Sequence, residues 1–325
     1  QALYAINNGR NLRGRPALGS WLTYGLGSET QELPAYMVLS HPAGLPTFES
    51  EHFTNGWLPS LFQGTLIRPT EPRILNLDPP AALAGPAQAR QLDLLHSLNE
   101  AHLAEHPGEL DLQARISSYT LAAKMQSAAK EALDISNEPA HVKKLYGVDD
   151  AKTRDYATRC IIARRLIERG VRFVQLYHRG WDQHIALERQ LPNQCRDVDQ
   201  PTAALMNDLR QRGLLDDTLV IFATEFGRTV FSQGVFGDPA MGRDHHGRCF
   251  TVWLAGAGIR PGMEYGRTDD FCYNIVENPV HVHDLHATIL HCLGIDHQRF
   301  TYRYRGLDVR LTGVEEAHVV RGILA

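Results

Sequence analysis

The chain has 325 residues, of which 43% are hydrophobic and 22% charged, a composition typical of a globular protein. Its net charge of -4 offers no broad basic surface for nucleic acid, and no apolar run approaches the roughly 18 residues that span a membrane. The five cysteines lie far apart without a C-x-x-C pair, which argues against a disulfide framework or a thiolate zinc site.

The first half of the chain predicts a strand, a long loop region and a block of helices. Residues 33–40 (LPAYMVLS) are typical of a short buried strand, and Gly/Pro-rich loops follow to about residue 86. The pattern over about 88–150 is helical and carries no obvious chemistry. We therefore expect one domain over residues 1–325 with a helical insertion at about 88–150.

Helical and strand-like segments alternate through the second half. In chain order they are a helix at 153–170, a strand at 171–177, a helix from Pro201, strands at 218–224 and 249–256, and a helix at 282–294. The run TLVIFAT (218–224) is continuously apolar, as in a strand covered on both faces. This alternation indicates βαβ units, so we predict a three-layer α/β/α sandwich with a mostly parallel sheet.

Three polar clusters lie near the predicted strand ends, where ligands gather in open α/β sheets. HRGWDQH (178–184) follows the strand that ends at Tyr177, and EFGRT (225–229) follows the strand that ends near Thr224. GRDHHGR (242–248) instead precedes a strand. It can reach the same edge of the sheet only if that strand runs antiparallel to the others.

These clusters contain candidate ligands for a metal and candidate partners for an anion. The candidate metal ligands are Asp182, His184, Glu225, His245 and His246. Mixed imidazole and carboxylate ligands suit zinc, manganese or iron, and a catalytic metal would keep one position open for substrate. The candidate anion-binding residues are His178, Arg179, Arg228 and Arg243.

Each feature also has a structural interpretation. An isolated Asp-x-His is commonly a hydrogen-bonded turn, and Glu225 and Arg228 could simply pair with each other. The histidines of HVHDLHATILH more often cap and face a helix than bind metal. The metal hypothesis is favoured because three clusters fall at one predicted sheet edge.

Several segments resemble a known family. GVRFVQLYHRGWDQH, GLLDDTLVIFATEFGRT, GRDHHGR and NPVHVHDLHATILHCLGIDH resemble a bacterial, typically exported, sulfatase-like family, domain of unknown function number fifteen-oh-one. That family is placed in the alkaline phosphatase superfamily, which implies the same three-layer fold around a two-metal hydrolytic site. The resemblance also implies an exported or periplasmic protein with a divalent metal, zinc in the first place and manganese or calcium as alternatives.

The superfamily's metal ligands can be matched to this sequence only in part. Its aspartate and histidine after a mid-chain strand resemble Asp182 and His184, and its histidine before a late strand resembles His245. Its Asp-His pair falls on Glu225 and Phe226, and phenylalanine cannot bind a metal. One ligand of the second metal is therefore lost, or is supplied by a neighbour such as His246 or Asp244.

The resemblance further implies that the nucleophile and a first-strand aspartate lie upstream of Gln1. We thus expect the chain to lack the N-terminal part of the domain and to be inactive by itself. The leading hypothesis for the whole protein is a metal-dependent hydrolase of small-molecule or glycan phosphate or sulfate esters. The alternatives are a non-catalytic, degenerate member that binds an anionic glycan or a protein partner, and a purely structural role for the polar clusters.

Overall fold

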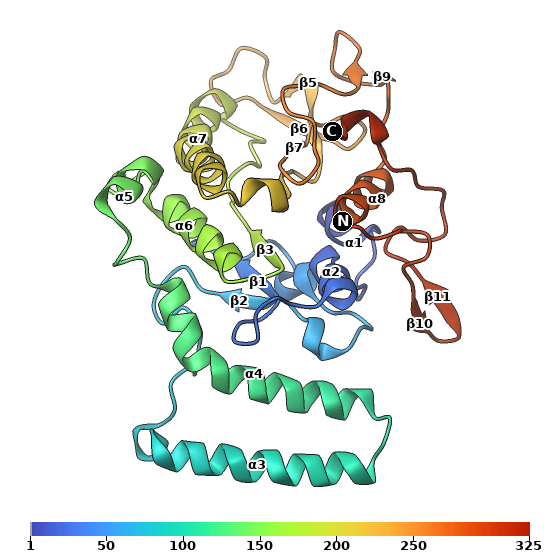
Figure 1. The fold of residues 1–325 in the computed structure, drawn as a ribbon. Coiled ribbons are helices and arrows are strands. Elements are labelled where there is room, and N and C mark those ends of the chain that lie inside the picture. Colours follow the sequence, from blue (N-terminus) through green and yellow to red (C-terminus); the bar gives the residue numbers. More distant parts are fainter. Residues whose placement is uncertain (1) are drawn as a thin grey trace.

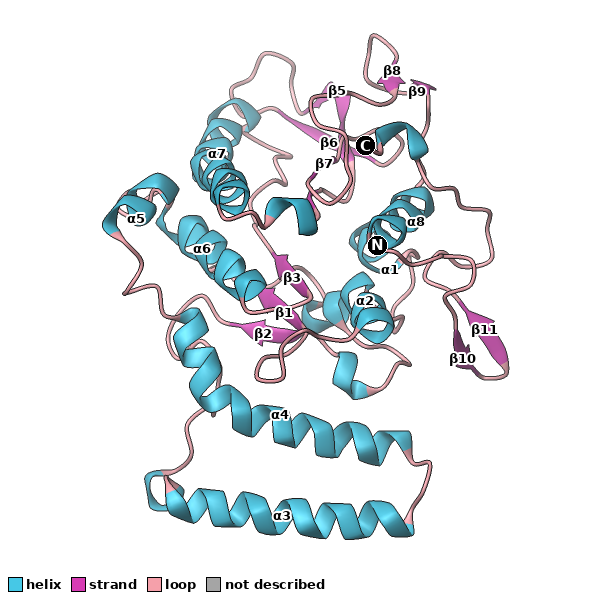
Figure 2. Ribbon diagram, in the orientation of Figure 1, coloured by secondary structure: helices cyan, strands magenta, loops and turns pink. Residues whose placement is uncertain are grey.

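The computed structural model describes residues 2–325, and its helices and strands are shown in Figures 1 and 2. The helices are α1 (Ala2–Asn8), α2 (Leu18–Leu26), α3 (Pro86–Glu105), α4 (Leu110–Leu133), α5 (Ala140–Tyr146), α6 (Arg154–Glu168), α7 (Leu187–Gln211) and α8 (Val282–Cys292). The strands are β1 (Tyr36–Leu39), β2 (Thr65–Ile67), β3 (Phe173–Leu176), β4 (Val220–Phe222), β5 (Gly227–Gln233), β6 (Gly242–His246), β7 (Trp253–Ala255), β8 (Arg267–Thr268), β9 (Ile275–Glu277), β10 (Tyr302–Tyr304) and β11 (Leu307–Val309). In residues 2–325, no helix combines the length and apolarity needed to cross a lipid bilayer.

A small parallel sheet lies at the centre of the molecule, with the strand order β2-β1-β3. Every residue of β1 is buried, because helices or loops cover both of its faces. Met37 and Leu39 pack in one apolar cluster with residues of α4 and α6, whereas Tyr36 and Val38 pack with Phe53 in another. This alternation follows from the two-residue period of a strand. It confirms the buried strand predicted within residues 33–40.

The prediction of a mostly parallel three-layer α/β/α sandwich of the alkaline phosphatase or sulfatase type is wrong. Only the β2-β1-β3 sheet is parallel, and the other described sheets are antiparallel pairs: β4-β7, β5-β6, β8-β9 and β10-β11. The apolar run 218–224 yields the short strand β4, which is half-buried and pairs with β7. A continuous apolar run indicates burial, but it identifies neither the partner of a strand nor its direction.

The helices of the first half differ in how much they contribute to the core. Helix α4 contributes Met125 and Ala129 to the cluster that covers the parallel sheet. Helix α3 has no buried residue among its described side chains, and Figure 1 shows it at the edge of the molecule beside α4. Most of the surface of α3 therefore faces solvent.

A buried network of charges holds α5, α6 and α7 together. Arg164 Nη2 lies 2.7 Å from Glu138 Oε2, and its Nε lies 3.1 Å from Asp208 Oδ2. Arg165 Nη1 lies 2.5 Å from the other oxygen of Glu138, and the Tyr146 hydroxyl donates to Asp208 over 3.0 Å. Burial alone would raise the pKa of Glu138, but hydrogen bonds from the two arginines hold it below its ordinary value.

We expect Glu138→Ala to destabilise the protein strongly. The Glu138 side chain is only 4% exposed, and its loss would leave Arg165 without a carboxylate partner and remove one of the carboxylates around the buried Arg164, at a cost of about 3–5 kcal/mol. The control is Glu131→Ala, which removes a surface pair with Arg169 whose carboxylate is 75% exposed, worth about 1 kcal/mol at most. Urea unfolding measures the free energy of unfolding of both variants, and an equal loss of stability in the two would contradict the role of the buried network.

Two histidines of α8 hold the N-terminal segment against this helix. His283 Nε2 donates to the carbonyl oxygen of Gly9 over 2.6 Å, and His286 Nε2 donates to that of Ile6 over 2.8 Å. Because His286 is fully buried, desolvation lowers its pKa from 6.5 to about 4, with a smaller contribution from His283. Its ring is therefore neutral in the folded protein.

This neutral histidine predicts a loss of stability in mild acid. Between about pH 6.5 and pH 4, His286 binds a proton in the unfolded chain but not in the folded protein. The free energy of unfolding therefore decreases by about 3 kcal/mol as the pH is lowered from 6.5 to 4. His286→Gln can still donate to Ile6 but cannot titrate, and we expect it to flatten the profile. His291→Gln, an exposed change on the same helix, should leave it unchanged. Urea midpoints from pH 4 to 7 test this, and identical profiles for all three proteins would refute it.

Candidate metal centre

The loop after β3 carries Asp182 and His184 and runs along the strand β6. Ile185 forms an isolated antiparallel bridge with Met241, and the backbone amide of Arg243 donates to the carbonyl of Gln183 over 3.2 Å. Gly242 makes this approach possible, because a Cβ atom there would overlap the His184 carbonyl group. The glycine of the GRDHH segment thus fixes where the Asp182 loop lies.

The register of the β5-β6 pair brings two further residues to Asp182. Arg228 and His245 are direct cross-strand partners in this antiparallel pair. Arg228 Nη2 donates to Asp182 Oδ1 over 2.7 Å, and His245 Nε2 lies 2.8 Å from the same oxygen. Strand β7 runs antiparallel to β4, but β4 and β7 form a sheet separate from β3, so the β5-β6 pair and not a shared sheet edge brings the third cluster to Asp182.

Asp182, His184 and His245 offer three metal-ligand atoms that converge on one point. His184 Nε2 lies 3.1 Å from Asp182 Oδ1 and 2.9 Å from His245 Nε2. With zinc bonds of about 2.0–2.2 Å, tetrahedral ligand atoms lie about 3.3 Å apart. The three atoms would need to separate by about half an ångström or less, so this donor set fits a divalent metal.

The surroundings of His184 and Asp182 favour their metal-binding forms. His184 Nδ1 lies 2.6 Å from Gln233 Oε1, so Nδ1 carries the hydrogen and the lone pair of Nε2 points into the group. The ring of His245 packs against that of Phe226, with centroids 4.0 Å apart. Burial acts to raise the pKa of Asp182, but hydrogen bonds from His245 and Arg228 hold it below its ordinary value. Asp182 is therefore ionised, and it remains 68% exposed to solvent.

Two of the proposed ligands do not join this group. His246 is buried, and its Nε2 donates to the carbonyl oxygen of Tyr273 over 2.7 Å while its ring stacks on that residue. Successive side chains of a strand point to opposite faces, which separates His246 from its neighbour His245. Glu225 lies in the turn between β4 and β5 and is outside the three-residue group.

The proposed anion-binding residues have different partners. Arg228 donates to Asp182 at 2.7 Å, so its ion pair is with Asp182 rather than with Glu225. It also donates to the backbone carbonyls of Trp181 and Arg243, both at a distance of 3.0 Å. Arg243 is exposed. Arg179 donates to the Ala43 carbonyl over 2.6 Å, and His178 Nε2 lies 3.1 Å from Gln194 Oε1.

Two residues beside His178 were missed in the sequence. Arg159 is 3% exposed and donates only to the backbone carbonyls of Asp155 and Tyr177, with no carboxylate partner among the described residues. The ring of His41 lies 5.1 Å from that of His178. Burial, with Arg159 and His178 nearby, lowers the pKa of His41 to about 4. The signal available in the sequence is a basic residue, Arg159, within the helix predicted at 153–170.

Comparison with family models matches residues 1–324 to the family described as "Protein of unknown function (DUF1501)". The match covers nearly the whole chain, and the protein therefore belongs to this family. Comparison with curated proteins and with solved structures gave no match.

We expect Gln233→Leu to weaken zinc binding by about 10–100-fold, the usual effect of losing a hydrogen-bond partner of a metal-binding histidine. The change leaves all three ligands in place but frees the His184 ring to rotate and to change its tautomer. Ser232→Ala, at the adjacent position of β5, is the control. Competition with a chromophoric chelator measures the affinity, and equal values for the two variants would exclude a role for Gln233.

Proposed function

We propose that the protein is a metal-dependent hydrolase of phosphate or sulfate esters, acting on a small molecule or a glycan. The observation that carries this proposal is the convergence of Asp182, His184 and His245 from two segments about 60 residues apart in sequence. A hydrogen-bonded turn alone does not explain why two imidazoles and a carboxylate converge on one solvent-exposed point. We include in the proposal that the metal is zinc and that the family is related to the alkaline phosphatases.

The side chains around the group have separable roles in this proposal. Asp182, His184 and His245 would hold the metal, which when bound supplies a Lewis acid for charge developing on the ester oxygens. Arg228 keeps Asp182 ionised and fixes its orientation through bonds to two backbone carbonyls. Arg228 is therefore a positioning residue rather than a free anion clamp.

Two arginines, Arg159 in α6 and Arg179 in the loop after β3, would attract the anionic substrate. They lie near His41 and His178, but burial lowers the pKa of both histidines, so the positive charge here comes from the arginines. Since Arg159 lacks a carboxylate partner among the described residues, its charge is not neutralised locally. Uncompensated positive charge beside an open site concentrates anions there.

A second candidate function is non-catalytic binding of an anionic glycan or a protein partner. It is favoured by Phe226, whose ring packs on His245 at the position where the superfamily resemblance implies a metal-ligating histidine. Glu225 is also outside the ligand group, so the described residues around Asp182 gather ligands for one ion at this centre rather than two. A single ion can hold an anion without hydrolysing it.

Metal content and ester hydrolysis test both candidates. The protein, expressed from its complete coding sequence, would be compared with Asp182→Ala and His245→Ala by elemental mass spectrometry and with aryl phosphate, phosphodiester and sulfate substrates. We expect both variants to lose one metal ion per chain, the one held at this centre, and any hydrolysis. The control is His246→Gln, because the adjacent histidine faces Tyr273 and its loss should spare both.

The possible outcomes separate the candidates. Unchanged metal content in both Asp182→Ala and His245→Ala would overturn the metal centre itself. Metal loss in these variants without turnover of any ester by the parent protein would contradict the hydrolase. If the parent then retains a sulfated or phosphorylated glycan that the variants release, the binding function is supported instead.

A further inference from the structure

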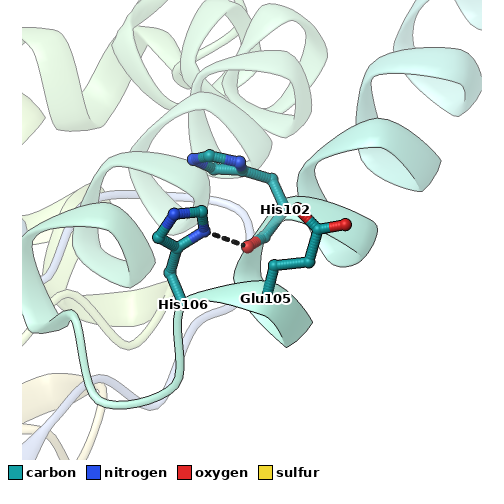
Figure 3. Close-up of side chains that lie close together, drawn as sticks. All are labelled: His102, Glu105 and His106. Atoms are coloured by element: carbon teal, nitrogen blue, oxygen red, sulfur yellow. Dashed lines mark hydrogen bonds between the residues drawn. The ribbon is translucent and has the colours of Figure 1, made fainter.

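The C-terminal end of α3 carries two histidines and a glutamate within the segment HLAEH, residues 102–106. Figure 3 shows His102, Glu105 and His106 gathered at this end of the helix. Each of the three offers one ligand atom, and these atoms lie within 4.8 Å of one another. The helix ends at Glu105, and His106 leaves the helical conformation with φ -126° and ψ 62°.

The two imidazoles are held side by side. Their ring centroids lie 4.3 Å apart, and His106 Nδ1 lies 2.9 Å from the backbone carbonyl oxygen of His102. Because a carbonyl only accepts, Nδ1 of His106 carries the hydrogen and Nε2 keeps its lone pair. A backbone carbonyl that fixes the tautomer in this way is a common partner of metal-binding histidines.

The electrostatic setting also favours a cation. The last carbonyls of a helix and its macrodipole place partial negative charge at the C-terminal end. Among the described residues, Glu105 has no ion pair with a lysine, arginine or histidine, so its carboxylate is free to contribute a full charge. His102 and Glu105 are exposed and His106 is half-buried, so a hydrated ion can reach all three.

We propose that His102, Glu105 and His106 form a second divalent-metal site, of the imidazole and carboxylate type that suits zinc, nickel or copper. With three protein ligands, at least one position stays open for water or for a group from another molecule. Figure 1 shows α3 at the opposite end of the molecule from β5 and β6. The site is therefore independent of the candidate centre at Asp182 and of the proposed function.

Zinc titration of variants that lack the Asp182 centre isolates this site. In an Asp182→Ala/His245→Ala background we expect calorimetry to show one remaining zinc ion per chain. Adding His102→Ala or His106→Ala should weaken its binding by more than the 10–100-fold typical of losing an outer hydrogen-bond partner, because a ligand itself is lost. Both residues lie at the edge of the molecule, so the fold should persist, which circular dichroism checks.

His96→Ala provides the matched control. His96 lies on the same helix and pairs with Glu100 over 3.2 Å, but it belongs to no three-ligand group among the described residues. Unchanged zinc affinity in His96→Ala, together with its loss in the other two variants, would support the site. Zinc binding that is absent from the background protein, that survives both changes, or that falls equally with His96→Ala would overturn it.

Discussion

The arrangement of the candidate centre depends on one cross-strand pair, Arg228 opposite His245 in the β5-β6 ladder. Both side chains reach the same oxygen of Asp182, one as a guanidinium donor and the other as an imidazole. A one-residue slip of this register would turn His245 to the other face of the strand. The adjacent position is occupied by His246, whose imidazole bonds to Tyr273 instead. The register therefore decides which of two neighbouring histidines can become a ligand.

The same two strands position the rest of the group. Gln233 and Gly242 are also cross-strand partners, and both affect His184. The Gln233 amide fixes the tautomer of the His184 ring, and Gly242 leaves room for the His184 carbonyl group because it has no Cβ atom. The β5-β6 pair thus supplies one ligand, two positioning side chains and the contact surface for the loop that carries the other ligands. The small parallel sheet contributes by fixing the point at which this loop leaves β3.

Part of this arrangement was predictable from the sequence. Grouping the three polar clusters brought Asp182, His184 and His245 together, although β3 and β4 lie in separate sheets and the clusters do not share one sheet edge. The fold class was not predictable, because the apolar run that forms β4 pairs with β7 and not with the parallel sheet. The separation of His245 from His246 was also hidden. GRDHH has no alternation of apolar and polar residues to mark it as a strand, yet its strand geometry sends the two rings to opposite faces.

Phe226 shows what an aromatic ring does next to such a group. Its ring packs against His245 and lies 5.7 Å from the guanidinium carbon of Arg228, so it supports both partners of Asp182 without offering a ligand. An aromatic ring stabilises a cation near its face. The Phe226 ring therefore helps to hold the Arg228 side chain in its orientation toward Asp182. In the proposed function, this packing would take the place of a second ion's ligand and would stiffen the first ion's site. If the site acts on an ester, cationic side chains must neutralise the substrate charge that a second metal would otherwise neutralise. Arg159 bonds to the Tyr177 carbonyl at the start of the same loop and has no carboxylate partner among the described residues, so its buried charge would add positive potential there without contacting the substrate.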